Sequence, residues 1–333
     1  MDKVYFLLKL NRVIKSARIK SLGIFFLHVF KRRYIGIFLD PVLACNLRCR
    51  MCYFSDEAKR KELKGRFSDE ELLLVANAFF HRALKLQIGC GAEPSLYKHN
   101  VEIIRLAKKT HIPYISLTTN GILFSEEDLR QLVEAGLNEI TLSLHGVKKE
   151  TYEYFMSGAS FDKFCEVLQA LNDIKKEYLH LKIRINYTVN KDNLEDLRDF
   201  FNVFGTHHFD IIQVRPIQEI GNSDYHNFSW SDIYERYDEI ISSFKNKCIE
   251  KNITCLIPNK HDLVKSSNEE SSVSEQTYCY VSPRGIWEND FDIQKDTFET
   301  YSKRKHLAWV YFKKVFERKS KKTTKRSLNY EVI

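Results

Sequence analysis

Short apolar runs and longer segments with helical periodicity alternate six times between residues 34 and 257. Apolar runs of about four to eight residues predict buried strands, and the helical segments between them predict crossover connections. The predicted strands span residues 34–39, 86–90, 114–118, 138–144, 182–189 and 211–214. Strands joined through helices run parallel, so the pattern predicts an α/β fold with one parallel sheet covered by helices. The alternation alone allows either a barrel or a doubly wound open sheet.

Capping residues mark the start of two of the helices. Ser68 is an N-cap whose capping box is completed by Glu71, and Ser125 caps a helix that ends near Gly136. The predicted helices span residues 68–84, 100–109, 125–136, 149–155, 161–177, 194–204 and 231–251. Six strands therefore each precede a helix.

Three cysteines follow the first predicted strand with the spacing C-x3-C-x2-C: Cys45, Cys49 and Cys52. A tetrahedral zinc site normally has four protein ligands, whereas a [4Fe–4S] cluster held by three thiolates leaves one iron open. A loop at the carboxyl end of a first strand is also the usual active-site position in α/β barrels. The spacing favours the cluster. The alternatives are a zinc site completed by a distant ligand and a buried trio of reduced thiols.

This cysteine motif on the first β/α loop resembles the signature of the radical S-adenosylmethionine (radical SAM) superfamily. The resemblance covers about residues 34–220. It implies a partial (β/α)6 TIM-like barrel, with a [4Fe–4S] cluster and S-adenosylmethionine (SAM) as cofactors. Within the superfamily the chain is distantly similar to molybdenum-cofactor enzyme A and to SPASM-type proteins, with a reduced C-terminal extension.

Two further motifs match the superfamily at strand ends. Residues 91–94 (Gly-Ala-Glu-Pro) resemble its Gly-Gly-Glu-Pro motif, which implies that Glu93 holds the amino group of SAM. An ammonium group needs such an anionic acceptor, although Glu93 could instead cap the next helix. Residues 118–121 match a Thr-x-Asn-Gly run common in the superfamily, so Thr119 and Asn120 are cofactor-binding candidates. The alternative is that Asn-Gly simply forms a good turn.

The resemblance adds two more candidates for SAM binding. Met51 stands where relatives often have an aromatic residue whose backbone meets adenine, a contact that needs no particular side chain. Ser143 ends the fourth strand, where relatives contact the ribose or the carboxylate. Many relatives carry Asp at the position of His145, and a single His at a strand end is more often structural.

The fifth predicted strand places Lys182, Arg184, Asn186 and Thr188 on one face. Four polar side chains facing one way inside a parallel sheet are costly without partners, so they predict a polar barrel lumen around a ligand. The geometry of Arg184 suits a bidentate contact with the methionine carboxylate, and Asn186 could contact the ribose. The alternative register turns this face toward a helix or solvent.

The net charge of +8 is concentrated at the two ends of the chain. Residues 1–33 hold nine Lys and Arg against one Asp, and residues 303–326 hold eleven against one Glu. Apolar residues recur at helical spacing in the first segment, at Leu7, Leu10, Ile14 and Ala17. Such a basic amphipathic helix would contact an anionic membrane surface or an acidic partner, or pack over the bottom of the barrel. We favour packing. No recognisable motif supports nucleic-acid binding.

These patterns predict three regions: a basic amphipathic helix over 1–33, the core barrel over 34–257, and a linker and C-terminal extension with a basic tail over 258–333. No secretory signal or membrane span is expected, and eight cysteines then indicate a reducing cytoplasm, with peripheral contact at the inner membrane surface as an option. Cys279 matches only part of the pattern that binds an auxiliary cluster, so that cluster is the less favoured alternative.

The resemblance implies a radical SAM enzyme of unknown specific reaction. A reduced cluster held by Cys45, Cys49 and Cys52 would cleave SAM to a 5′-deoxyadenosyl radical, which abstracts hydrogen from an unidentified peptide, lipid-linked or small-molecule substrate. An electron donor such as flavodoxin or ferredoxin would be required. The alternative is a non-catalytic iron–sulfur or zinc binding module on the same barrel.

Overall fold

The computed structural model describes residues 13–14, 16–218, 221–226, 228–229, 231–258, 260 and 276–316. These residues form one nine-stranded sheet in the order β7-β6-β5-β4-β3-β2-β1-β8-β9. The strands are β1 (Ile35–Leu39), β2 (Ala83–Ile88), β3 (Tyr114–Thr119), β4 (Glu139–Leu144), β5 (Lys182–Val189), β6 (Ile211–Pro216), β7 (Thr254–Leu256), β8 (Tyr278–Ser282) and β9 (Gly285–Ile286). All neighbours are parallel except β8 and β9.

The prediction of an α/β partial barrel is confirmed. Strands β1 to β6 are the six predicted ones, and β7 and β9 form the open edges of a sheet that does not close. Strand β8, from the predicted C-terminal extension, pairs directly with β1. The predicted boundaries at 33 and 257 stay predictions.

The helices also follow the predicted order. They are α2 (Ala17–Val29), α3 (Glu57–Glu62), α4 (Asp69–Phe79), α5 (Asn100–Lys109), α6 (Glu126–Glu134), α7 (Lys149–Phe155), α8 (Phe161–Glu177), α9 (Phe200–Phe204), α10 (Ser231–Glu250), α13 (Phe298–Arg304) and α14 (Leu307–Phe316), with short 3-10 turns η1 (Phe80–Arg82), η2 (Pro94–Leu96) and η3 (Glu195–Arg198). The caps at Ser68 and Ser125 are confirmed, each as a full capping box. The prediction that the first of these helices runs to residue 84 is wrong, because β2 begins at Ala83.

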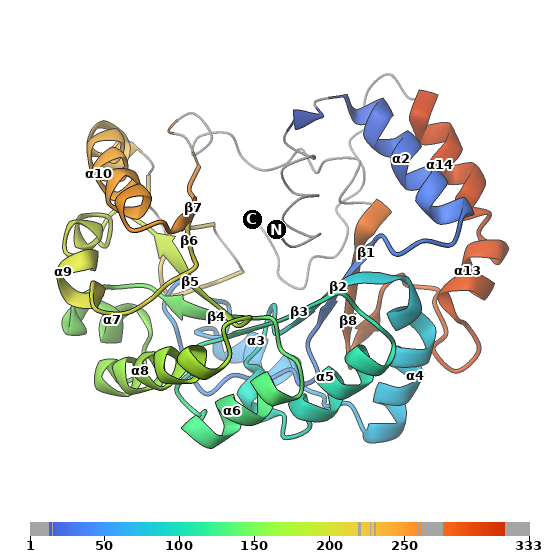
Figure 1. Ribbon diagram of the computed structural model, residues 1–333, viewed down its shortest axis with the longest axis horizontal. Coiled ribbons are helices and arrows are strands. Elements are labelled where there is room, and N and C mark those ends of the chain that lie inside the picture. The colour runs from blue at the N-terminus through green and yellow to red at the C-terminus, as the bar shows by residue number, and fades with distance from the viewer. Residues whose placement is uncertain are drawn as a thin grey trace.

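The two faces of the sheet differ sharply. Side chains that point outward, such as Ile37, Leu117 and Ile185, are fully buried beneath helices. Figure 1 shows α4, α5, α6, α8, α9 and α10 around the convex side of the curved sheet. The concave side carries the alternate residues of each strand, many of them polar, such as Thr141, Ser143 and Asn186.

At the β1 edge, α2 lies beside α14 (Figure 1). Ser16 caps α2, and His28 near its end contacts the hydroxyls of Tyr34 (2.9 Å) and Ser302 (3.0 Å). Because Tyr34 directly precedes β1, these contacts fix α2 near the amino end of that strand. Most of the amphipathic segment predicted over 1–33 before α2, including Leu7 and Leu10, lies outside the described residues. No described helix combines the length and apolar character that crossing a bilayer requires.

Candidate functional site

The three predicted cysteine ligands lie on the loop between β1 and α3, each a half-buried free thiol. The backbone pins this loop against the end of α7: the Arg48 N–H donates to Ser157 O (2.8 Å) and the Arg50 N–H to Phe155 O (2.9 Å). Within the loop the Cys52 N–H donates to Cys49 O (2.9 Å). The cysteine positions are therefore set by main-chain contacts that do not depend on a bound metal.

The three thiols share one buried environment. Burial raises the pKa of Cys45 to about 12 and that of Cys52 to about 11. Burial raises the pKa of Cys49 further, and its two neighbouring cysteines add to the effect. Glu93 also contributes to the raised pKa of Cys45 and Cys49, which places its carboxyl group close to them. Without a cation these thiols hold their protons.

The donor set fits a [4Fe–4S] cluster. Three thiols on one loop supply three ligands and leave a fourth iron for a small molecule, and iron stabilises the thiolate forms that burial disfavours. Among the described residues, no group of three or more Cys, His, Asp and Glu side chains is arranged so that it could hold a single metal ion.

Glu93 is fully buried at the end of the loop that follows β2. Its Oε1 accepts from Thr119 Oγ1 (2.5 Å) and from the Ser95 N–H (3.0 Å), and its Oε2 accepts from the Asn120 N–H (2.8 Å). Burial raises the pKa of Glu93, and these donors oppose that rise. The structure thus brings together Glu93, Thr119 and Asn120. The bond from Ser95 shows that Glu93 also caps η2, the alternative considered for it.

Two hydrogen bonds join Glu93 and Asn120 to the cysteine loop. The Glu93 N–H donates to Ala44 O (2.9 Å), and Asn120 Nδ2 donates to Asn46 Oδ1 (2.9 Å). The carboxyl ends of β1, β2 and β3 are therefore one connected unit, which we call the β1–β3 rim. Contacts of the rim with SAM stay a prediction.

Asp40 is a central rim residue that the sequence interpretation missed. It follows β1, is fully buried, and accepts from the Cys90 N–H (2.7 Å), the Gly91 N–H (3.0 Å) and the Tyr280 hydroxyl (2.8 Å). Burial raises the pKa of Asp40, and the same donors oppose the rise. The sequence does carry a signal for Asp40, because a carboxylate directly after an apolar strand lies where α/β barrels usually place their functional residues.

Met51 and His145 lie toward the other half of the sheet. The Met51 side chain is buried with Phe155 and Ile217, and Asn190 Nδ2 contacts its sulfur (3.0 Å). Burial lowers the pKa of His145 to about 4, and its Nδ1 contacts Leu144 O (2.9 Å). His145 is therefore neutral at pH 7 and bound to its own strand, as expected for a structural residue. The predicted adenine contact at Met51 stays a prediction.

Ser143 and Asn186 are partners in register on neighbouring strands and share the concave face. Asn186 is almost fully buried, yet its Oδ1 has no hydrogen-bond partner among the described residues. A buried acceptor without a donor is costly, so this atom fits a ligand that brings a hydroxyl or N–H group.

Arg184 lies deeper and has other partners. It is paired in register with Thr141. Thr188, near the carboxyl end of β5, is four residues or about 13 Å of strand further along. Its Nη1 contacts Glu139 Oε1 (3.4 Å), and its Nη2 donates to Gln213 Oε1. The structure therefore does not bring Arg184 to the β1–β3 rim. The predicted contact with the methionine carboxylate stays a prediction, and the observed contacts are with the sheet.

Arg184 belongs to a charged cluster on the concave face, which we call the concave floor. The Tyr114 hydroxyl donates to Glu139 Oε2 (2.6 Å), and the Lys85 and Lys182 Nζ atoms lie 5.9 and 5.5 Å from the Tyr114 ring centroid. Burial lowers the pKa of Lys85. Three cationic side chains and one carboxylate share this floor, a composition that suits an anionic group.

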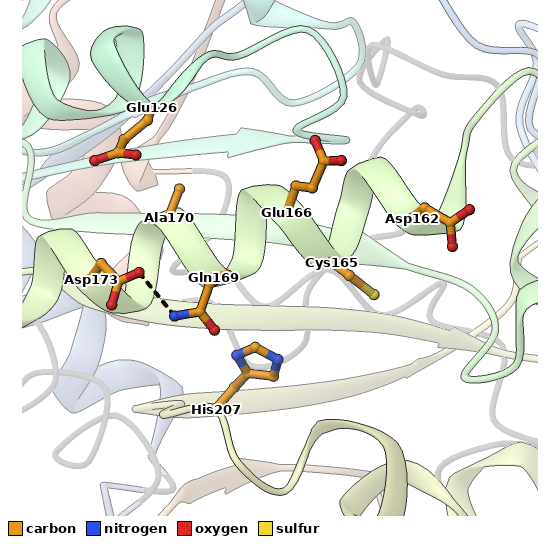
Figure 2. A pocket seen from close by; sticks show the side chains of 8 residues that line it. All are labelled: Glu126, Asp162, Cys165, Glu166, Gln169, Ala170, Asp173 and His207. Carbon is orange, nitrogen blue, oxygen red and sulfur yellow. Dashed lines mark hydrogen bonds between the residues drawn. The ribbon is translucent and has the colours of Figure 1, made fainter.

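Cys279, the candidate ligand of an auxiliary cluster, points from β8 into the hydrophobic core. A surface pocket of about 650 Å³ lies on the convex side, at α8 and the start of α6. Figure 2 shows its lining side chains: Glu126, Asp162, Cys165, Glu166, Gln169, Ala170, Asp173 and His207. None of them is a predicted site residue.

Comparisons with known proteins agree on the type of domain. The family model for the Radical SAM superfamily matches residues 40–204. A probable GTP 3′,8-cyclase of Saccharolobus solfataricus is 31% identical over 181 residues, which cover 52% of this chain and 55% of that protein. The protein of the same description from Sulfurisphaera tokodaii is 28% identical over 176 residues, covering 52% and 54%. The chain spans about half the length of these curated relatives.

Solved structures show the same fold. SuiB of Streptococcus suis bound to S-adenosylmethionine superposes with a TM-score of 0.63 at 15% identity, covering 81% of this chain and 65% of that one. Native anSMEcpe with bound AdoMet gives 0.51 at 20% identity, covering 67% and 64%.

Proposed function

Because residues 40–204 of this chain form a domain of the radical SAM superfamily, we propose that the protein is a radical SAM enzyme. In this proposal Cys45, Cys49 and Cys52 hold a [4Fe–4S] cluster, and SAM binds beside it along the β1–β3 rim. The observation that carries the proposal is the rim itself, where three thiols and the buried Glu93 carboxyl are neighbours in one hydrogen-bonded unit.

Each rim residue has a definable task. When bound, a reduced cluster would supply one electron to SAM, which splits SAM into methionine and a 5′-deoxyadenosyl radical. The three thiols must each lose a proton to ligate iron, which explains why the metal must be present to hold them as thiolates. Glu93 Oε2, with one donor against two on Oε1, keeps room to accept from the ammonium group of SAM.

The concave face would hold the rest of the reacting molecules. Asn186 Oδ1 is available to accept from a ribose hydroxyl, with Ser143 beside it. The sheet and its helices keep water from one side, which protects a radical from quenching. A substrate held on this face would supply the hydrogen atom that the 5′-deoxyadenosyl radical abstracts.

We propose that the substrate carries an anionic group that reaches the concave floor of Lys85, Lys182 and Arg184. The similarity to probable GTP 3′,8-cyclases makes GTP the first probe, and the peptide-binding neighbour SuiB makes a peptide the contrasting one. Stimulation of SAM cleavage by GTP but not by the matched nucleoside guanosine would support the anionic class. Equal stimulation by both would contradict it.

Two partners complete the proposal. An external reductant such as flavodoxin or ferredoxin would deliver the electron that each cleavage of SAM consumes. We also propose that the basic ends of the chain contact a membrane surface.

The experiment is anaerobic. The chain is loaded with iron and sulfide, SAM and dithionite are added, and 5′-deoxyadenosine is quantified by chromatography. We expect product from the native chain, none from Cys49→Ala, and native levels from Cys165→Ala, a cysteine on the convex side.

A non-catalytic binding module is the competing function. It predicts a well-formed cluster, no 5′-deoxyadenosine with or without GTP, and SAM affinity that Glu93→Gln leaves unchanged. That combination would exclude the radical enzyme, whereas a loss of SAM affinity in Glu93→Gln would support it.

A further inference from the structure

The outer face of the α2–α14 pair is apolar, although it faces solvent. Ten of the sixteen exposed large apolar side chains among the described residues lie within residues 13–30 and 309–316. The most prominent are Ile19 (57% exposed), Phe26 (47%), Phe30 (67%), Trp309 (55%) and Phe316 (65%). A concentration of this kind marks an interaction surface, whereas single exposed apolar residues are ordinary.

The pattern of α2 is inverted relative to an ordinary surface helix. Its fully buried positions are Ser21, Ile24 and His28, two of which are polar. Its exposed positions at helical spacing are Ile19, Leu22, Phe26 and, just past the helix end, Phe30. A surface helix normally turns its apolar stripe inward, so α2 carries a second stripe that the described fold does not use.

Aromatic rings join the two helices into one surface. The rings of Phe25 and Phe312 lie 5.4 Å apart across the pair, and Phe312 lies 5.6 Å from Trp309 and 5.1 Å from Phe316. Figure 1 shows α2 and α14 side by side at the periphery of the molecule. We call this surface the α2/α14 ridge, made of Ile19, Leu22, Phe26, Phe30, Trp309 and Phe316.

The charges around the ridge are of one sign. Residues 16–33 and 305–316 contain no Asp or Glu. Exposed cations border the apolar strip at Arg18, Lys31, Arg32 and Lys313, and the Lys313 Nζ lies 5.1 Å from the Trp309 ring centroid. The sequence that continues from α14 is also basic, since residues 303–326 hold eleven Lys and Arg against one Glu.

We propose that the α2/α14 ridge docks the protein on an anionic lipid bilayer. Phe and Trp side chains insert at the level of the headgroups, and Lys and Arg side chains contact lipid phosphates. A second copy of the chain fits less well, because a symmetric contact through this ridge would bring cations against cations. The ridge lies on the surface, since α2 is only 13 residues long, about 20 Å, against a hydrocarbon core of about 30 Å.

The test is co-sedimentation of the full chain with vesicles of phosphatidylcholine alone or with one quarter phosphatidylglycerol. We expect binding to the anionic vesicles that weakens as salt is raised, and little binding to the neutral ones. The variant Phe26→Ser with Trp309→Ser should bind at least tenfold more weakly. The control Leu179→Ser with Ile249→Ser removes two apolar side chains elsewhere that are even more exposed, and it should bind like the native chain.

Two results would overturn the proposal. One is equal binding of the ridge variant and the native chain to anionic vesicles. The other is a native dimer in light scattering that the ridge variant dissociates, which would make the ridge an interface between copies. Because the assay contains neither SAM nor reductant, its failure would leave the proposed radical chemistry untouched.

Discussion

The β1–β3 rim and the concave face of β4–β6 both bury polar groups, but they differ in how those groups are satisfied. On the rim, Asp40 and Glu93 each accept hydrogen bonds from three donors. On β5, Asn186 Oδ1 and Arg184 Nε have no partner within the described part of the chain. The two rim carboxylates thus have their donors as folded, whereas these two polar atoms on β5 lack partners in that part of the chain.

The difference indicates a division of labour. Groups that are mutually satisfied hold positions without help from a ligand, which suits the residues that present the cysteine loop. Groups left unsatisfied cost free energy until a ligand pairs with them, which suits residues that bind what enters.

Removing the Asp40 carboxylate should destabilise the fold strongly. Asp40→Ala leaves the Cys90 N–H, the Gly91 N–H and the Tyr280 hydroxyl without their shared acceptor. We expect the free energy of unfolding to fall by about 3 kcal/mol in a urea titration. The control Asp162→Ala removes an exposed carboxylate and should change it by less than about 0.5 kcal/mol.

A methyl group at Gly89 should also disturb the rim. Gly89 has φ +77°, and an added Cβ would lie 2.3 Å from Thr118 O. We expect Gly89→Ala to lose more than about 1 kcal/mol of stability, whereas Gly23→Ala in α2, with open space around it, should gain up to about 1 kcal/mol. Equal effects at the two positions would show that the rim tolerates displacement.

The buried His145 predicts a pH dependence. Burial lowers its pKa from 6.5 to about 4. Between these values the unfolded chain binds more protons than the folded one, so this contribution to stability rises from pH 4 to about 6.5 and is level above. The free energy of unfolding, measured as a function of pH, should rise more steeply across that window for the native chain than for the His145→Asn variant. Parallel curves would mean that His145 titrates normally.

The smallest stability effect is expected at Asn186. Asn186→Ala removes an unsatisfied acceptor, so the free energy of unfolding should change by less than about 1 kcal/mol. The affinity of the cluster-loaded chain for SAM should fall about tenfold in calorimetry, the value of one hydrogen bond. A large stability loss with unchanged affinity would make Asn186 a structural residue. Asn172→Ala, on the convex side, is the control for affinity.

Local patterns predicted the main elements of the fold well. Strand β5 spans the predicted residues 182–189, because β-branched and aromatic residues alternate with polar ones along it and leave few alternatives. Strand β7 is three residues long and β8 joins β1 from about 240 residues away, so neither has a strong local signal.

The site was predicted only as far as its motifs reach. The motifs located Cys45, Glu93 and Asn120, which the structure brings into one unit. Asp40 accepts from Tyr280, which lies 240 residues away in the sequence, and Arg184 contacts Glu139 on the preceding strand, β4. Such pairings depend on strand order and register, which a single sequence does not reveal.

The central claim is that three cysteines hold a cluster with one open iron that SAM occupies. Mössbauer spectroscopy of the anaerobically loaded native chain, recorded with and without SAM, tests it most directly. We predict that SAM changes the signal of one iron in four, because three thiolates leave one iron unligated by protein. Four irons that do not respond to SAM, or a chain that binds zinc in their place, would contradict the account.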